Sequence, residues 1–261
     1  MKTGFIQFSP SLGKPEVTLS KLDSLLNDAA DVDLITLPEL CNSGYNFNDK
    51  SMAFALAETV SDSPFIRLLE AKARENNQYI VSGFHEKEGE LMYNSSVLVG
   101  PEGYLGIYRK LHLFWNEKDI FEPGNLGLPV FKLPNGITIG MLVCFDWMFP
   151  EVWRNLALQG AEIVCHPSNL VLPGFAQKAI PIHALINRYF VVTANRIGTE
   201  KQLTFTGMST MANPKGEVLF QAGPEEERVY FMDLPLDQAK DKWITPRNHA
   251  LEDRRPECYG K

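Results

Sequence analysis

Three residues that could carry chemistry each follow a hydrophobic run typical of a β-strand. Glu39 follows DLITLP, Lys110 follows YLGIYR, and Cys144 follows ITIGMLV. In layered α/β proteins, binding and catalytic residues commonly lie where strands end. A thiol can act as a nucleophile, and a buried carboxylate can act as a general base near neutral pH. A buried lysine requires a partner of opposite charge, and a carboxylate is the natural one.

Cys144 has two interpretations. Free cysteines are among the most buried residues, so the first is a core thiol at the end of a strand. The second is a nucleophile, because the FPEVW stretch that follows is typical of a helix start. The positive end of a helix dipole would lower the pKa of the thiol. The N–H group of Phe145 would then point at a developing oxyanion.

The other candidates also have plain structural interpretations. Glu39 could be an exposed carboxylate that ends a strand, and Lys110 could be a solvated surface lysine. The RKLHLF stretch nevertheless places Lys110 between apolar neighbours. Glu117 and Glu122 lie in FWNEKDIFEPG, whose aromatic and charged composition fits either a surface loop or the wall of a pocket. The residues are more specific together than any one of them is alone.

Two rival chemistries use histidine. A Cys–His hydrolase is one, since the chain has five histidines, among them His112 and His166. A metal site beside Cys165 and His166 is the other. The histidines lack close metal-ligand spacing, and neither HxH nor HExxH occurs. Neither a GxSxG motif nor a glycine-rich phosphate loop is found. We therefore expect no metal and no cofactor.

Composition narrows the class of protein. The formal net charge is −7, which argues against nucleic acid and anionic membranes, since both attract basic surfaces. No apolar run is long enough to span a bilayer, and the first residues lack the hydrophobic segment of a signal peptide. The four cysteines are scattered and form no CxxC pair, which is typical of reduced thiols. We expect a cytoplasmic protein.

The 261 residues alternate strand-like and helix-like patterns without a linker, which predicts one layered α/β domain whose sheets are covered by helices. Two strand–helix–strand units, around Glu39 and around Cys144, suggest a weak internal duplication. The polar segment 243–261 is not expected to pack on its own. The expected helices span residues 15–30, 63–77, 150–160 and 179–189; the expected strands span 4–10, 33–40, 79–84, 93–100, 104–110, 137–145, 161–168, 190–198 and 228–235, with a hairpin at 209–220.

Together these motifs resemble the nitrilase, or carbon–nitrogen hydrolase, superfamily, whose members carry a Glu–Lys–Cys triad in this order. The resemblance implies a four-layer α-β-β-α sandwich, covering residues 1–242, that dimerises or assembles further. Segment 243–261 would reach across to the partner at the dimer interface. The motifs are LPEL, YRKLHLFWNEKDIFEPG, LVCFDWMFPE, GAEIVCHPSNL, VVTANRIG, FTGMSTMANPKGEVL and DRRPECY.

The resemblance assigns roles to matching positions. Glu39 matches the general base, Lys110 the lysine that stabilises the oxyanion, and Cys144 the nucleophile. Glu117 matches an additional glutamate that orders the site, and the Phe145 N–H would share the oxyanion with Lys110. Three further positions are expected to line the substrate pocket, namely Tyr45, Trp147 and Asn169.

Two departures from the family pattern matter. Nitrilases proper typically show Cys-Trp-Glu at the nucleophile, and here the sequence is Cys144-Phe145-Asp146, closer to amidases and carbamoylases. His183 and Ile186 stand where the family commonly has Arg and Glu, which indicates a paired structural replacement. We therefore expect a cofactor-independent amidase acting on a small carboxamide, such as an ω-amide, with release of ammonia. A nitrilase, an N-carbamoyl amidohydrolase and a catalytically silent partner-binding protein remain alternatives.

Overall fold

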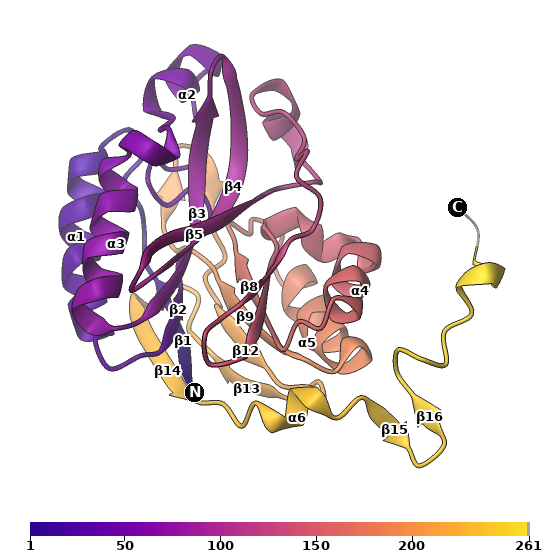
Figure 1. Ribbon diagram of the computed structural model, residues 1–261. Helices are drawn as coiled ribbons and strands as arrows, with labels where there is room; N and C mark the ends of the chain where they lie inside the picture. The colour runs from indigo at the N-terminus through magenta and orange to yellow at the C-terminus, as the bar shows by residue number, and fades with distance from the viewer. Residues whose placement is uncertain (260–261) are drawn as a thin grey trace.

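The computed structural model describes residues 1–259, in which two six-stranded β-sheets face each other between two layers of helices (Figure 1). Helices α1 (Pro15–Asp28) and α3 (Pro64–Asn76) cover one sheet. Helices α4 (Pro150–Leu158) and α5 (Phe175–Asn187) cover the other. The α/β class and the four-layer α-β-β-α sandwich predicted above are confirmed.

The first sheet has its three parallel strands side by side and antiparallel strands at both edges. Strands β1, β2 and β3 pair in parallel, β14 pairs antiparallel with β1, and β4 and β5 extend the sheet as a meander. Its strands in spatial order are β14 (Arg228–Asp233), β1 (Lys2–Gln7), β2 (Leu34–Thr36), β3 (Tyr79–Glu88), β4 (Leu91–Gly100) and β5 (Gly103–Arg109).

The second sheet repeats this plan. Strands β7, β8 and β9 are parallel, with antiparallel partners on either side. In both sheets the loops after the parallel strands therefore open toward one end, as expected for a site at strand ends. Its strands in spatial order are β13 (Val218–Gln221), β12 (Thr210–Ala212), β9 (Phe190–Ala194), β8 (Ile163–Pro167), β7 (Thr138–Met141) and β6 (Val130–Lys132).

Local signals place the helix ends. Helix α3 begins at Pro64 because Pro suits the first turn and the Ser63 hydroxyl accepts the Ile66 N–H at 2.9 Å. It ends before Asn77, which adopts the left-handed conformation with φ 51°. Helix α5 begins four residues before the predicted 179, because Pro181 marks a first turn in sequence but here lies inside the helix.

Shorter elements fill the connections, and several of them were not predicted. Helix α2 begins after Asp49, whose carboxylate accepts the Met52 N–H at 2.8 Å. These elements are α2 (Lys50–Leu56), α6 (Asp237–Lys240), the pairs β10 (Thr199–Glu200) with β11 (Leu203–Thr204) and β15 (Trp243–Thr245) with β16 (Asn248–His249), and 3₁₀ turns at Val60–Asp62, Trp115–Asp119, Cys144–Met148 and Pro256–Cys258.

The largest hydrophobic core lies between the two sheets and under α4 and α5. It includes Phe5 and Tyr108 from the first sheet, Met141 from the second, and Trp153 from α4, all essentially buried. A second core lies between the first sheet and helices α1 and α3. Because dense cores are rigid, the strand ends next to them hold their side chains in fixed positions.

Segment 243–259 projects from the body in yellow (Figure 1). The Arg154 guanidinium donates to Ala250 O at 3.0 Å, but Trp243 and Ile244 are largely exposed. The position of this segment at a dimer interface, and the dimer itself, stay predictions.

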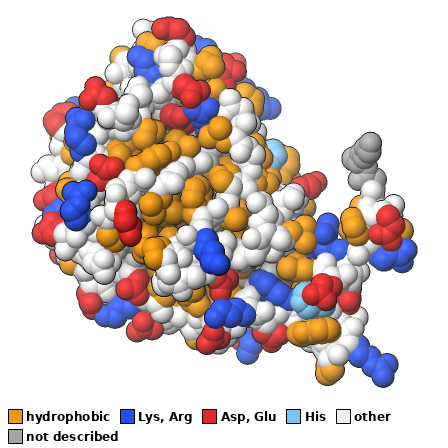
Figure 2. Space-filling model, in the orientation of Figure 1, with side chains coloured by type: hydrophobic (Ala, Val, Ile, Leu, Met, Phe, Trp, Pro, Cys, Tyr) orange, Lys and Arg blue, Asp and Glu red, His pale blue; other side chains and the backbone are white. Residues whose placement is uncertain are grey.

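On the face shown in Figure 2, hydrophobic side chains gather over β5, where Tyr104 and Leu105 are exposed. Within residues 1–259 no helix is long and apolar enough to cross a membrane.

Candidate active site

Glu39 stands on a tight turn that follows β2. Pro38 ends the strand pattern, and Leu40 adopts a left-handed conformation with φ 45°. The turn packs directly on β3, where a Cβ at Gly83 would lie 2.3 Å from the Glu39 Cα. Only glycine permits this approach, and Gly83 bonds to Pro38 O and Cys41 N through its backbone. The side chain of Glu39 is fully buried.

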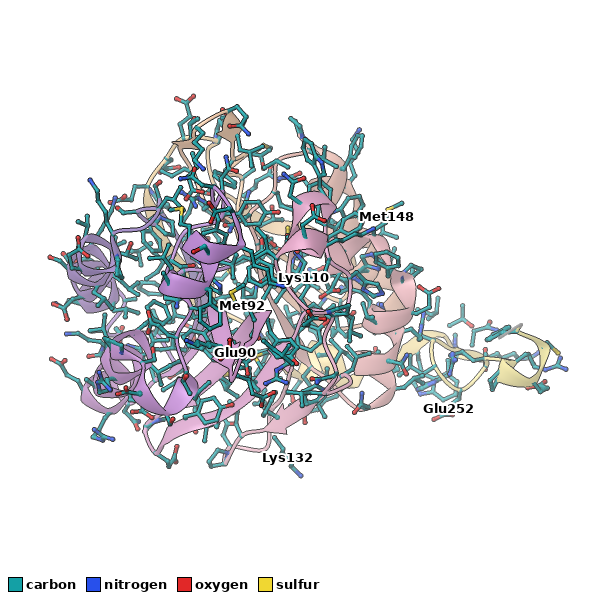
Figure 3. All side chains as sticks on the ribbon, turned by 90° about the horizontal axis from the view of Figure 1, so that it is seen from above. Glu90, Met92, Lys110, Lys132, Met148 and Glu252 are labelled. Atoms are coloured by element: carbon teal, nitrogen blue, oxygen red, sulfur yellow. The ribbon has the colours of Figure 1, made fainter. Side chains whose placement is uncertain are left out.

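Lys110 is the residue after β5. Its N–H donates to Asn94 O at 2.8 Å, which prolongs the pairing with β4. Gly124 N donates to Lys110 O at 2.8 Å, and a Cβ at Gly124 would lie 2.0 Å from Arg109 O. Arg109 pairs with Glu86, so Lys110 turns toward the opposite face of the strand. Seen from above, Lys110 lies in the interior, whereas Lys132 and Glu252 lie at the periphery (Figure 3).

Cys144 lies on a sharp turn and not in a strand. The predicted strand 137–145 was wrong at its end, because β7 stops at Met141 and residues Cys144–Met148 form a 3₁₀ turn. Cys144 has φ 42°, a conformation that costs energy for a residue other than glycine and persists only where the surroundings enforce it. The thiol is 5 % exposed. The turn thus presents Cys144 to a cavity that also contacts Phe114 and Asn169.

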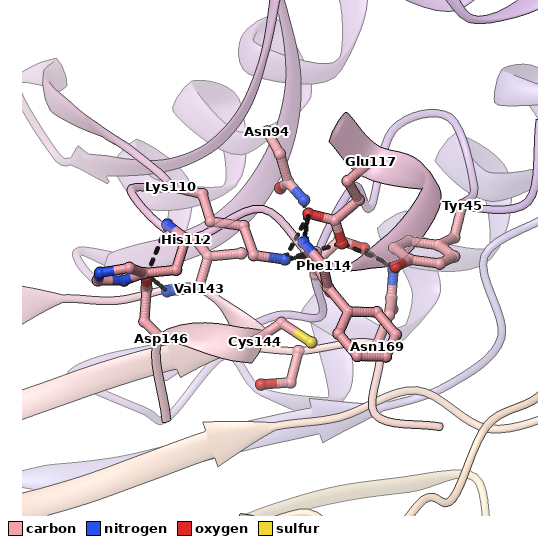
Figure 4. A network of polar contacts seen from close by, with 12 residues as sticks. Tyr45, Asn94, Lys110, His112, Phe114, Glu117, Val143, Cys144, Asp146 and Asn169 are labelled. Atoms are coloured by element: carbon pink, nitrogen blue, oxygen red, sulfur yellow. Dashed lines mark hydrogen bonds and ion pairs between the residues drawn. The ribbon is translucent and has the colours of Figure 1, made fainter. Parts of the chain in front are cut away.

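The turn after β2, the end of β5 and the 3₁₀ turn Trp115–Asp119 bring Glu39, Lys110 and Glu117 into one buried cluster (Figure 4). The Lys110 Nζ lies 2.8 Å from Glu39 Oε1 and 2.8 Å from each carboxylate oxygen of Glu117. Asn94 Nδ2 donates to Glu39 Oε1 at 2.6 Å, and the Tyr45 hydroxyl donates to Glu117 Oε1 at 2.7 Å. Lys110 therefore pairs with two carboxylates, which confirms the predicted partner of opposite charge. The alternative interpretation of Lys110 as a solvated surface residue is excluded.

The cluster joins one buried amine to two buried carboxyl groups, and both burial and charge shape its pKa values. Burial by itself lowers the pKa of Lys110, but the charges of Glu117 and Glu39 outweigh it, and the net pKa is raised. Burial raises the pKa of Glu117, and the nearby Lys110 only partly opposes this. Lys110 is therefore a permanent cation between two acids.

The pKa of Cys144 moves in the direction opposite to our prediction. Burial and then the Glu39 charge raise it well above the usual value of 9.0, while Lys110 and the Asn169 backbone lower it to a lesser degree. Helix α4 begins six residues after Cys144, so the dipole expected to lower the pKa is too distant to dominate. Cys144 is consequently a neutral thiol at rest.

Glu39 has one oxygen that accepts no hydrogen bond from any described residue. Its Oε1 accepts from both Asn94 and Lys110, whereas Oε2 is buried and without a hydrogen-bond partner. A buried acceptor of this kind is uncommon, since nearly all such atoms are paired. Oε2 is therefore the atom available to accept a proton.

The predicted pocket residues fall into different roles. Asn169 Nδ2 donates to Glu39 O at 3.0 Å, so Asn169 supports the turn of Glu39 as well as lining the cavity beside Cys144. Trp147 lines that same cavity. Tyr45 lines an adjoining cavity of about 80 Å³ that also contacts Glu117. The two cavities meet at Phe114 and Val171, the side chains that both of them contact.

Sequence analysis missed several residues that shape the site. Asn94 bonds Glu39, and only its position in the YNSSVLVG strand pattern could have shown that it faces inward. Asp146 is buried behind the Cys144 turn and bonds both Tyr108 and His112. Glu122, weighed as a pocket residue, lies at a separate surface hollow beside Leu113 and Pro123.

The geometry supports neither of the two histidine-based alternatives, the Cys–His hydrolase and the metal site beside Cys165 and His166. His166 Nε2 lies 2.9 Å from the carbonyl oxygen of Cys144, and its Nδ1 lies 3.1 Å from the Thr193 hydroxyl. Burial lowers the pKa of His166 to about 4. Its ring therefore fixes the Cys144 turn and does not activate the thiol. Within the described chain, no three His, Cys, Asp or Glu side chains are placed to hold a metal ion.

The His183 and Ile186 departure has a structural explanation. His183 stacks on Trp153 with ring centroids 4.6 Å apart, and its Nε2 lies 2.9 Å from Trp147 O. Ile186 is 39 % exposed on α5. His183 thus supports the Cys144–Met148 turn from behind, without an ion pair across the helix face.

Comparison with known proteins agrees with this geometry. The family model described as Carbon-nitrogen hydrolase matches residues 2–242. A nitrilase from Pyrococcus abyssi is 42 % identical over 99 % of both chains. An (R)-stereoselective amidase from Pseudomonas sp. is 36 % identical over 92 % of this chain and 87 % of its own. The structure of an amidase from Nesterenkonia sp. superposes with a TM-score of 0.82 at 26 % identity, covering 98 % of this chain and 94 % of that one. The chain therefore belongs to the carbon–nitrogen hydrolase family.

Proposed function

We propose that this enzyme hydrolyses a small carboxamide through a thioester on Cys144 and releases ammonia. The observation that carries the proposal is the buried Lys110 ammonium, 2.8 Å from both Glu39 and Glu117, with the Cys144 thiol close enough to be influenced by all three charges (Figure 4). Side chains of this chain can thus supply the proposed nucleophile, base and fixed cation. In a structure of a mutant of the Nesterenkonia sp. AN1 amidase, the acetamide moiety of fluoroacetamide is covalently added at the active-site cysteine.

Acylation would begin as the proton of Cys144 passes to Glu39 Oε2 while the carbon–sulfur bond forms. The sulfur attacks the amide carbon, and the oxygen that becomes negative is stabilised by the Lys110 ammonium and the Phe145 N–H. Phe145 lies in the first turn of a 3₁₀ helix, where N–H groups lack acceptors within the helix. The proton on Glu39 then passes to the nitrogen, the C–N bond breaks, and ammonia leaves.

Deacylation would use the same groups in reverse. Glu39 removes a proton from water, the hydroxide attacks the thioester carbon, and Lys110 again faces the oxyanion. The C–S bond breaks, and the thiol regains its proton from Glu39. Glu117 holds Lys110 in place in both steps, because it contacts the Nζ through both oxygens and is itself bonded by Tyr45.

The raised pKa of Cys144 constrains how attack occurs. Burial and the Glu39 charge disfavour a free thiolate. The proton must therefore move to Glu39 as the carbon–sulfur bond forms. This fits a base-assisted attack and does not fit a pre-formed thiolate such as occurs beside a helix N-terminus.

The cavities favour an uncharged substrate. The walls are mainly aromatic and aliphatic, including Phe47, Phe114 and Leu203, with the amides of Asn46, Asn116 and Gln202 among them. The one charged residue in these walls, Glu117, is already paired with Lys110. Of the described cations, Lys201 reaches the rim, where its ammonium donates to Asn46 O at 2.6 Å. A neutral amide fits these walls better than the ω-amide of a dicarboxylate.

Nitrile hydrolysis is the second candidate. The nitrilase from Pyrococcus abyssi is more similar in sequence to this chain than the Pseudomonas amidase is. The Cys144-Phe145-Asp146 sequence favoured an amide, but Asp146 is fully buried and contacts neither cavity. It therefore has no direct contact through which to select a substrate. N-carbamoyl compounds share the same attack geometry and complete the range of candidates.

A matched panel distinguishes these candidates. Isobutyramide, isobutyronitrile and N-isobutyl urea would be compared with succinamate by ammonia release, with acid and amide products quantified by chromatography. We expect the neutral amide to have the highest kcat/KM and Cys144→Ala to release no ammonia. Preference for the nitrile would establish the second candidate, and preference for succinamate that is lost in Lys201→Gln would establish recognition of a carboxylate. If none of these compounds is turned over and intact-mass measurement detects no covalent adduct on Cys144, the result would support a catalytically silent protein.

A further inference from the structure

The carboxylate of Asp146 lies at the centre of a second polar cluster, directly behind the Cys144 turn. Asp146 is fully buried. Its Oδ2 accepts from the Tyr108 hydroxyl at 2.8 Å and from Val143 N at 2.9 Å. Its Oδ1 accepts from His112 Nδ1 at 2.7 Å and from His112 N at 3.3 Å. One carboxylate thus receives four donors, which is nearly all that its lone pairs can accept.

The donors come from the two sides of Lys110. Tyr108 lies two residues before it and His112 two residues after it, and Val143 immediately precedes Cys144. Asp146 therefore ties the segment that carries Lys110 to the turn that carries Cys144 (Figure 4). The His112 ring is itself held by stacking on Phe149, with ring centroids 3.6 Å apart and planes inclined by 10°.

The turn requires such support because Cys144 has φ 42°. Two ring N–H groups also bond its carbonyl oxygens: His166 faces Cys144 O, and Trp153 donates to Asp146 O at 2.9 Å. These two bonds fix the turn to its own sheet and to α4. The bonds from Tyr108 and His112 to Asp146 are different, because they alone among these link the turn to the Lys110 segment.

We propose that Asp146 is a positioning residue that sets the geometry between the Cys144 thiol, the Phe145 N–H and the Lys110 ammonium. It acts on acyl transfer without touching the substrate, since it contacts neither cavity. This inference rests on the proposed function insofar as it assigns Lys110 and Phe145 to the oxyanion. An oxyanion is stabilised only by donors at the correct distance, so a small displacement of the turn costs much of the rate.

The informative variant is Asp146→Asn. An amide has one accepting oxygen and one donating nitrogen, so in either orientation its NH₂ group faces N–H donors of Val143 or of His112. Tyr108→Phe is a milder variant that deletes one of the four bonds and keeps the ring. Glu162→Gln is the matched control, because Glu162 is a nearly buried carboxylate that accepts Thr138 N at 3.0 Å at the opposite end of β7.

The experiment compares two reactions of the Cys144 sulfur in a Cys258→Ser background, since Cys258 is exposed. In the first, the sulfur attacks 4-nitrophenyl acetate, a thioester forms through an oxyanion, and 4-nitrophenolate leaves. In the second, it attacks methyl methanethiosulfonate, a mixed disulfide forms, and methanesulfinate leaves without a tetrahedral oxyanion at a carbonyl carbon. We expect Asp146→Asn to slow the first reaction on the order of 100-fold and the second less than about 10-fold. Tyr108→Phe should also slow the reaction with the ester more than the reaction with the thiosulfonate, but by a smaller factor.

The outcomes separate positioning from simple destabilisation. Equal slowing of both reactions, or equal effects of Asp146→Asn and Glu162→Gln, would overturn the proposal. Failure of Asp146→Asn to fold, judged by circular dichroism, leaves the decision to Tyr108→Phe by the same criterion. Wild-type protein that reacts with the thiosulfonate but not with the ester would also overturn it. Ammonia release from amides by the wild type is measured separately, so failure of the proposed function is seen independently.

Discussion

Replacement of Lys110 by Met tests the charge balance of the site most directly. The substitution keeps the length of the side chain and removes the ammonium, which leaves Glu39 and Glu117 as two buried carboxylates without their cation. Glu39 retains its bond from Asn94, and Glu117 retains its bond from Tyr45. Removal of one partner from a buried ion pair costs about 3–5 kcal/mol. We expect Lys110→Met to lose an amount in this range at pH 8.

The loss should depend on pH with a definite sign. The pKa of Glu117 is raised above 4.5 by burial in the wild type, and removal of Lys110, which opposes the rise, raises it further. The folded variant then binds more protons than the unfolded chain between pH 4.5 and that higher pKa, so its stability falls as pH rises through this interval. One proton corresponds to about 1.4 kcal/mol per pH unit, so the loss at pH 5 should be smaller than at pH 8, by about 1.4 kcal/mol for each unit by which the substitution raises the Glu117 pKa between these pH values.

Urea unfolding followed by tryptophan fluorescence measures both quantities, with m-values compared to check that the transition is unchanged. Lys118→Met is the matched control, because Lys118 lies in the same 3₁₀ segment as Glu117 but is exposed, and its loss should stay within about 0.5 kcal/mol. Equal destabilisation of Lys110→Met at pH 5 and pH 8 would refute the reasoning, because it would mean that the substitution does not change the protonation of a buried carboxylate between these pH values.

Three further variants probe the site. Glu39→Gln removes the carboxylate that we propose as the acceptor of the thiol proton, and single-turnover acylation should slow by about 10²–10⁴-fold; a change under tenfold would contradict its proposed role as base. Tyr45→Phe deletes the 2.7 Å bond to Glu117 and should cost about 1.5–3 kcal/mol in urea unfolding, whereas unchanged stability would show that the bond is replaced. His183→Ala loses the stacking on Trp153 and should lower stability by about 2–3 kcal/mol, while kcat at 25 °C should fall much less than in Asp146→Asn, because His183 contacts the turn at Trp147 and not beside Cys144; a kcat loss as large as that of Asp146→Asn at full folding would contradict this.

Much of the fold followed from short-range patterns. Pro64 and Asn77 bracket α3 as predicted, because capping depends on residues that are neighbours in sequence. The strand through Cys144 was predicted too long, since a hydrophobic run does not distinguish a strand from a buried 3₁₀ turn. Helix α2 was missed, and the start of α5 was misplaced by Pro181.

The sequence by itself determined which residues could do chemistry: a carboxylate, an ammonium and a thiol, each just beyond a hydrophobic run. Only the tertiary structure decided what they do to one another. Lys110 meets Glu39 across 71 residues of chain, and Asp146 meets Tyr108 across 38. Burial and charge act through space, and they raise the pKa of Cys144 where the local helix start predicted the reverse. Spacing in sequence identified the groups, and the packed sheets fixed their distances.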